Sequence, residues 1–334
     1  FEKSSRFNDF EIRNQLKPIK NYDEIQFVKK PNIVIFIIES MGREYWGELN
    51  KNRNIKNFKS FTPFLDSLSK HSLIFPNAFA TSRKSIHAMP SVLAGVPSFE
   101  IAYTSSYYSR QKLESLVSVS NALGYDTSFL HGAKNGSMGF QGFANTLGYD
   151  NYYGRDEFNN DEEYDGFWGI WDEPFLQFSK SILDYKNEPF LATIFTLSSH
   201  EPYIIPDKFK GMFDNGYLPI HKCVGYTDYS IRQFFKSIEK SSWFENTIFI
   251  FTSDHTNQSY FKYYQSTVNR FASPLLIYKK SSDFKGTDSR LASHLDIYPT
   301  VAELIGYKKP FRSWGRSLLS SKNESAFTIN YFGG

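Results

Sequence analysis

The sequence predicts an α/β fold in which a doubly wound, mostly parallel sheet is flanked by helices. Four short apolar runs rich in Ile, Val, Phe and Thr recur along the chain, each with the length and composition of a buried strand rather than a membrane span. Segments with helical spacing separate them, and this alternation is typical of parallel α/β sheets. The runs cover residues 32–38, 126–130, 190–197 and 247–253.

The expected helices are recognised by their ends. One over 62–70 would have Thr62 as its N-cap and Pro63 in its first position. Helices over 110–123 and 139–147 would each close at a glycine. The remaining expected elements are helices over 172–185, 222–240 and 295–305 and a late strand over 273–278.

The chain divides into one central region and two short ends. Residues 1–30 are charged and weakly periodic, and we expect a linker or a strap lying across the domain. Residues 31–306 carry the strand–helix alternation and are expected to form one domain. Breaks at Gly, Ser and Asn and a β-like stretch at 327–331 predict that 307–334 is a small C-terminal segment packed on it.

Composition excludes some classes of function. The 334 residues are 40% hydrophobic and 22% charged, which is typical of a globular protein. A net charge of +3 without a block of Lys or Arg argues against a nucleic-acid partner. Cys223 is the only cysteine, so no internal disulfide can form. Asp228 falls on the apolar face of its helix, and we expect it to be buried and hydrogen-bonded rather than part of a site.

Polar side chains stand where the apolar runs end. Glu39, His131 and Asp254 directly follow three of the runs, His255 comes next to Asp254, and His200 follows the remaining run through two serines. Ligand sites of open parallel sheets lie beyond the carboxyl ends of the strands. We therefore expect these side chains to share one rim of the sheet.

Three of these residues have the character of metal ligands. Asp254 and His255 can both reach one divalent cation, and Glu39 adds a carboxylate from another strand. Mixed oxygen and nitrogen ligation suits Zn or Mn, and Mg less well. An isolated Asp-His pair is also explained as a salt bridge at the start of a loop, but Glu39 at an equivalent strand end favours the metal.

Residues 81–91 are rich in hydroxyls and contain Arg83 and Lys84. They lead into a short apolar helix, whose first N–H groups favour an anion. A metal-bound hydroxyl there could lose its proton and attack phosphorus, while the two cations neutralise phosphoryl oxygens. By itself the segment is better explained as an ordinary N-cap serine followed by a helix. The local sequence also does not identify which hydroxyl would react. The candidates are Thr81, Ser82, Ser85 and Ser91.

Over about residues 30–305, the order and spacing of several motifs resemble the lipoteichoic acid synthase branch of the alkaline phosphatase and sulfatase superfamily. The motifs are Asn32–Ser40, Lys84-Ser85 ahead of Pro90, His131–Gly136, Ser199–Tyr203, Ser253–His255 and Asp296–Thr300. The resemblance implies a sulfatase-like catalytic domain of a phosphoglycerol-type transferase. It also implies one divalent ion held by Glu39, Ser85, Asp254 and His255, with Ser85 as the nucleophile.

The chain departs from this family's pattern in several places. Ser85 stands where a threonine is common among the synthases, and Thr256 where many relatives have Gly. The sulfatase signature needs Pro and Arg where this chain has His87 and Met89, so true sulfate-ester hydrolysis is not expected. No histidine occurs between 256 and 290, so a full second metal site is not expected.

The resemblance implies an enzyme of the bacterial cell envelope, at the extracytoplasmic face of the cytoplasmic membrane, with a helix bundle ahead of Phe1. Its partners would be a phospholipid donor, such as phosphatidylglycerol, and a glycan or lipid acceptor. Manganese is the favoured ion, with magnesium and zinc as alternatives. His131 and His200 match positions that contact the phosphate or headgroup, beside Arg83 and Lys84. The alternative functions are a hydrolase of phosphodiesters, phosphomonoesters or sulfate esters, and an inactive glycan- or lipid-binding domain.

Overall fold

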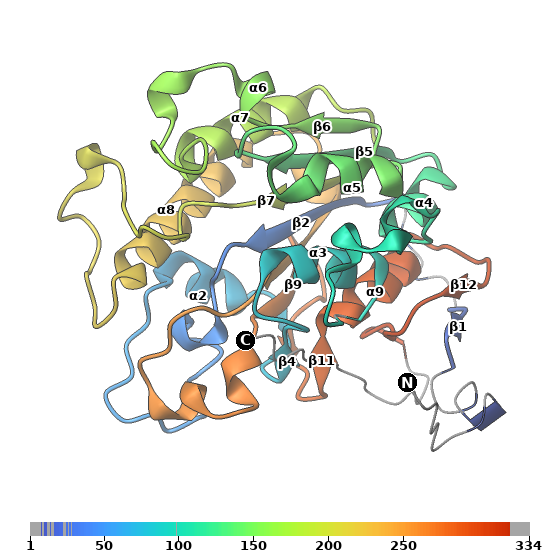
Figure 1. Cartoon of the computed structure of the whole chain (residues 1–334), viewed down its shortest axis with the longest axis horizontal. Helices are drawn as coiled ribbons and strands as arrows, with labels where there is room; N and C mark the ends of the chain where they lie inside the picture. Colours follow the sequence, from blue (N-terminus) through green and yellow to red (C-terminus); the bar gives the residue numbers. More distant parts are fainter. Residues whose placement is uncertain are drawn as a thin grey trace.

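The computed structural model describes residues 29–97 and 99–320, and ahead of them positions 8, 10, 11, 14, 17–22, 25 and 27. Its centre is an eight-stranded sheet of order β10-β3-β9-β8-β2-β7-β5-β6 (Figure 1). The bounds are β2 Asn32–Ile38, β3 Leu73–Ile74, β5 Asp126–His131, β6 Asn151–Tyr153, β7 Phe190–Phe195, β8 Thr247–Ser253, β9 Leu275–Lys279 and β10 Gly286–Thr287. Only β9 runs antiparallel to its neighbours β3 and β8, so the predicted mostly parallel sheet is confirmed.

The sheet has a hydrophobic core on each face because its central strands are apolar on both sides. In β2, Ile33, Ile35 and Ile37 pack into one core and Val34, Phe36 and Ile38 into the other. The first core contains α3 (Ser85–Ala94), α4 (Leu116–Asn121), α5 (Phe140–Leu147) and α9 (Ile297–Leu304). The second contains α2 (Pro63–Ser69), α7 (Asp172–Asp184) and α8 (Ile220–Ile238). The result is a three-layer α/β/α arrangement.

Most predicted helices lie within a few residues of their expected positions, but the helix predicted over 110–123 is wrong in its first half. The chain there forms a 3₁₀ turn, Tyr107–Arg110, and α4 begins only at Leu116. Ser115 accepts the Ser118 N–H and the Ser118 hydroxyl oxygen accepts the Ser115 N–H, a reciprocal cap that starts the helix at this point. The β-like stretch predicted at 327–331 lies outside the described residues.

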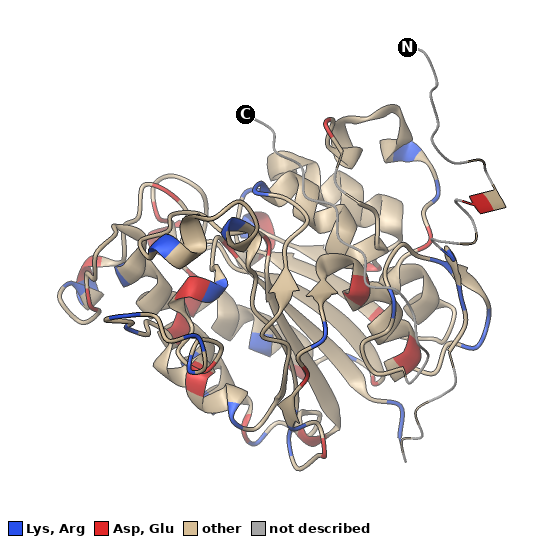
Figure 2. Ribbon diagram, turned by 90° about the horizontal axis from the view of Figure 1, so that it is seen from below, with Lys and Arg blue, Asp and Glu red and all other residues tan. Residues whose placement is uncertain are grey.

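Within the described residues, two small strand pairs lie outside the main sheet. β1 (Ile19–Lys20) pairs antiparallel with β12 (Phe311–Arg312), and β4 (Ala78–Phe79) pairs parallel with β11 (Ala292–Ser293). None of the helices in the described part of the chain combines the length and apolarity needed to cross a membrane. Figure 2 shows Lys, Arg, Asp and Glu mostly on helices and loops around uncharged central strands, with both signs interspersed.

Asp228 caps a helix from a distance. It lies on α8, is buried, and its two carboxylate oxygens accept the N–H groups of Phe64 and Leu65 in the first turn of α2, at 3.0 and 2.8 Å. The expectation that this residue is buried and hydrogen-bonded is confirmed. One side chain thereby joins two helices and satisfies two donors that α2 itself cannot.

The Asp228→Ala variant should lose about 2–3 kcal/mol of unfolding free energy, because it leaves two buried N–H groups unpaired. Urea unfolding followed by circular dichroism, in the presence of a chelator, measures this loss. The exposed Asp283 is the control, and Asp283→Ala should stay within about 0.5 kcal/mol of the wild type. Equal stability of Asp228→Ala and the wild type would contradict the capping role.

Candidate metal site

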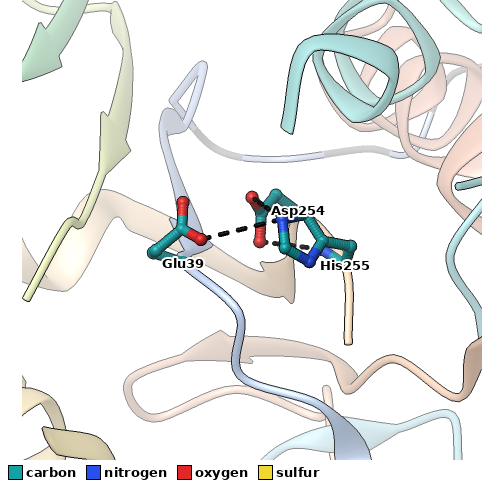
Figure 3. Close-up of side chains that lie close together, drawn as sticks. All are labelled: Glu39, Asp254 and His255. Carbon is teal, nitrogen blue, oxygen red and sulfur yellow. Dashed lines mark hydrogen bonds and ion pairs between the residues drawn. The ribbon is translucent and has the colours of Figure 1, made fainter. Parts of the chain in front are cut away.

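Adjacent parallel strands bring three potential metal ligands together. Ile38 and Ser253, the last residues of β2 and β8, are partners in the sheet register, so the residues that follow them emerge side by side. These are Glu39 on one strand and Asp254-His255 on the other. All three are buried, and one ligand atom from each lies within 4.8 Å of the others. Figure 3 shows the three side chains pointing toward one another.

The hydrogen bonds of His255 determine which of its nitrogens faces the two acids. Its Nδ1 lies 2.9 Å from the carbonyl oxygen of Thr256, which can only accept, so Nδ1 carries the proton. In the neutral ring, Nε2 then presents a lone pair 3.2 Å from Asp254 Oδ2 and 3.7 Å from Glu39 Oε1. Asp254 Oδ2 is buried and has no hydrogen-bond partner among the described residues. Nε2 and Asp254 Oδ2 thus face each other as two acceptors, an arrangement that suits a divalent cation, so these residues fit one.

The two buried carboxylates also need a positive charge close to them. Burial, and secondly the charge of Asp254, raise the pKa of Glu39 well above its usual range, while the Ser40 and Ser85 hydroxyls act in the opposite direction. Two ionised acids in one buried site repel each other unless positive charge is supplied. A bound cation would supply it and keep both acids ionised.

Ser85 is the candidate hydroxyl that meets this group. It is the first residue of α3, and its Oγ lies 3.4 Å from Glu39 Oε2 and 3.3 Å from His255 Nε2. The other three candidates bond elsewhere: Thr81 to Ser91, Ser91 to the Val96 carbonyl, and Ser82 to the Lys84 carbonyl. The predicted set of Glu39, Ser85, Asp254 and His255 is therefore assembled in one place.

Ser40 and Asn257 hold the acids in position, and sequence reasoning assigned them no role. The Ser40 N–H donates to Asp254 Oδ1 at 2.8 Å and its hydroxyl donates to Glu39 Oε1 at 2.6 Å. Asn257 donates in turn to Ser40 Oγ at 3.1 Å. Ser40 has a φ of 54°, a strained conformation for a non-glycine residue that recurs at functional sites. Its signal in the sequence is its place after Glu39, at the end of the Asn32–Ser40 motif, and Asn257 has none.

His131 ends β5 as predicted, and it is buried. Its Nδ1 donates to the Phe195 carbonyl at 3.0 Å, and its ring stacks on the Phe195 ring at 4.7 Å. Burial lowers the pKa of His131 to about 4, so the ring is neutral at physiological pH. Nε2, which has no partner among the described residues, can therefore accept a hydrogen bond but cannot donate one to a phosphate.

The other predicted substrate residues lie nearer the surface. His200 is half-buried in the turn after β7, and its Nδ1 donates to the Glu201 carbonyl at 3.0 Å. Arg83 is exposed and donates to the Asn257 carbonyl at 3.3 Å, and Lys84 is exposed at the start of α3. No hydrogen bond or ion pair within the described part of the chain joins these three to the acids or to His255.

Residues 31–307 match the family model described as Sulfatase. The chain belongs to the sulfatase family. It is 23% identical to lipoteichoic acid synthase 1 of Bacillus subtilis (strain 168), over 93% of this chain and 53% of that protein. It is 25% identical to phosphoglycerol transferase I of Escherichia fergusonii, over 90% of this chain and 40% of that protein. The chain thus spans about half, or less, of the length of the curated relatives it matches.

Solved structures confirm the fold of this sulfatase-family chain. A protein of the alkaline phosphatase superfamily from Vibrio parahaemolyticus is 26% identical and superposes with a TM-score of 0.79, over 95% of this chain and 75% of that one. The lipoteichoic acid synthase LtaP from Listeria monocytogenes is 22% identical and superposes with a TM-score of 0.76, over 90% of this chain and 79% of that one. The predicted family resemblance and fold class are confirmed, and the predicted enzyme class agrees with the names of these relatives.

Removing either acid should weaken metal binding. We expect Glu39→Gln and Asp254→Asn each to raise the Kd for Mn²⁺ by about 100-fold or more, a change at least as large as that from losing an outer-shell partner. Isothermal titration of the metal-stripped protein with Mn²⁺ measures this. Glu245→Gln, a change at an exposed carboxylate, is the control and should leave Kd unchanged. Unaltered binding in both site variants would exclude the metal site.

Proposed function

We propose that the chain is the catalytic domain of an extracytoplasmic, metal-dependent phosphoglycerol transferase of the bacterial cell envelope. The observation that carries the proposal is the Ser85 hydroxyl at a helix start, within 3.4 Å of two members of a group that fits one divalent cation. The names of the relatives, lipoteichoic acid synthase and phosphoglycerol transferase, support the same reaction class. The donor would be a membrane phospholipid such as phosphatidylglycerol.

The reaction would consist of two displacements at phosphorus. An ion held by Glu39, Asp254 and His255, with manganese favoured, would lower the pKa of the Ser85 hydroxyl and stabilise charge on phosphoryl oxygens. Ser85 Oγ forms a bond to phosphorus as the bond to the diacylglycerol oxygen breaks; the serine loses its proton and the departing oxygen gains one. An acceptor hydroxyl then attacks the phosphoglycerol-serine diester, and its proton balances the one that returns to Ser85.

The surrounding side chains suit this reaction. Arg83 and Lys84, next to the proposed nucleophile in sequence, place positive charge near the first turn of α3, and the N-terminus of a helix also favours an anion. The neutral His131 can accept a hydrogen bond from a hydroxyl of the glycerol headgroup. His200 also has its Nδ1 proton engaged with a carbonyl, so its Nε2 can accept a proton from an acceptor hydroxyl.

Ser85→Ala should lower turnover by about 1,000-fold or more while metal stays bound, because it removes the group that forms the covalent bond. Release of diacylglycerol from fluorescent phosphatidylglycerol with Mn²⁺ measures turnover. Ser85→Thr keeps a hydroxyl and should retain measurable activity. Ser82→Ala is the matched control and should stay within about threefold of the wild type. Full activity of a metal-loaded Ser85→Ala protein would exclude Ser85 as the nucleophile.

Product analysis distinguishes the transferase from a hydrolase of the same family. After brief mixing with the donor, mass spectrometry should find phosphoglycerol on the peptide that contains Ser85. With an acceptor present, the phosphoglycerol should appear on the acceptor. Glycerol phosphate found only in solution would indicate a hydrolase, and bound metal without any phosphodiester turnover would indicate a binding domain.

A further inference from the structure

Four large apolar side chains are exposed in the segment that follows α3. Phe99 is 56% exposed, Ile101 64%, Tyr107 100% and Tyr108 60%. All four line one groove of about 1260 Å³, which Trp314 lines from the segment after β12. An exposed apolar surface of this kind marks a contact with a lipid surface or with another protein.

This segment, residues 99–112, is called the apolar loop, and the main domain holds it in place. The Tyr103 ring packs against the Phe143 ring of α5, with the centroids 6.0 Å apart. The Ser109 carbonyl accepts the Thr146 hydroxyl of α5 at 3.3 Å. The loop is thus anchored before any partner arrives, and this lowers the entropy cost of docking.

Positive charge surrounds the apolar loop. Arg110 and Arg312 line the groove, Lys112 follows two residues after Arg110, and all three are exposed. Within the described part of the chain, none of these three side chains forms an ion pair. Lys308 and Lys309 are also exposed, in the turn that leads into β12. The acids nearby are Glu100, in the groove lining, and Glu114, whose carboxylate accepts the Arg312 N–H at 2.9 Å.

We propose that the apolar loop, together with Arg312, is a docking surface for an anionic phospholipid bilayer. Tyrosine rings suit the headgroup region, phenylalanine and isoleucine can enter the acyl boundary, and lysine and arginine attract anionic headgroups. The loop contains none of the residues assigned to the metal or to phosphoryl transfer, so the inference does not depend on that chemistry. It begins just after α3, a helix of ten residues that spans about 15 Å and starts at Ser85.

Charge favours a bilayer over a second copy of the chain as the occupant. In a symmetric dimer through this surface, the same patch of each copy would meet its partner. The excess of cations in one patch would then face the excess in the other, and like charges opposed across an interface are unfavourable. An anionic bilayer instead neutralises them.

Sedimentation with vesicles provides the first test. The wild type should bind vesicles of phosphatidylcholine mixed with phosphatidylserine, bind phosphatidylcholine alone more weakly, and lose binding as salt is raised. A chelator and phosphatidylserine are used so that the metal site does not contribute. Replacing Tyr107 and Tyr108 together by Ser should weaken binding by about tenfold or more. Arg110→Gln and Lys112→Gln should each weaken it by roughly fivefold.

Matched controls lie on α7 and α8, which cover the opposite face of the sheet. Tyr185→Ser changes a tyrosine that is 90% exposed, and Lys236→Gln changes an exposed lysine. Both variants should bind like the wild type. No binding by the wild type, or equal binding by the Tyr107 and Tyr108 double variant, would overturn the inference. Self-association that depends on Tyr107 and Tyr108, without vesicle binding, would overturn it in favour of a second copy.

Tryptophan fluorescence tests which face of the molecule meets the lipid. Phosphatidylcholine with brominated acyl chains, mixed with phosphatidylserine, should quench the emission of the wild type, because Trp314 lines the groove. Trp314→Phe should remove most of this quenching. Trp168→Phe, a change at a partly exposed ring in the loop before α7, should retain it. Quenching that is lost with Trp168 and kept without Trp314 would place the bilayer elsewhere and overturn the inference.

Discussion

The register between β2 and β8 is the constraint on which the site depends. It places Glu39 beside Asp254 and His255 at the buried ends of two central strands, where water cannot screen the two carboxylates. The pKa of Glu39 is raised by this burial and by the neighbouring acid, and Asp254 Oδ2 has no hydrogen-bond partner among the described residues. Hydrophobic cores on both faces of the sheet hold these strands in place. The packing of the sheet therefore offsets the repulsion between the two carboxylates, which would be unfavourable without a cation.

A second group of contacts connects this arrangement to the surface. Ser40 bonds to both acids, and Asn257 bonds to Ser40. The Tyr203 hydroxyl donates to Asn257 Oδ1 at 3.1 Å, and the Asn257 carbonyl accepts from Arg83. Tyr203, like Ser40, has a positive φ, at 58°. Backbone strain at both residues is stabilised by side-chain bonds, which is the expected pattern where a site must be formed before substrate binds.

The group of acids around Ser85 and the half-buried His200 are held by different parts of the fold. Strands and the start of α3 position the nucleophile and the acids, where displacements of an ångström would matter. Trp168, in the loop before α7, packs its ring against that of His200, with the centroids 4.2 Å apart, and this loop is positioned by the Asp165 carboxylate and by a backbone bond to the segment after β5. A change in this loop can therefore act on His200 without disturbing the group of acids. This separation is consistent with the general use of loops for specificity on a rigid α/β scaffold.

The sequence by itself determined the fold class, the strands and the polar residues at their ends, because apolar runs of this length can only be buried and parallel strands bring their carboxyl ends to one rim. It placed Glu39, Asp254 and His255 together, but from local physics it could not choose among four hydroxyls, since that choice depends on where α3 docks. In the tertiary structure Ser85 is the one of the four that contacts Glu39 and His255, and the same structure determines the late start of α4, where the Ser115 cap outweighed helical periodicity. The roles of Ser40 and Asn257 were decided there too, because their partners are distant in the chain or depend on backbone conformation.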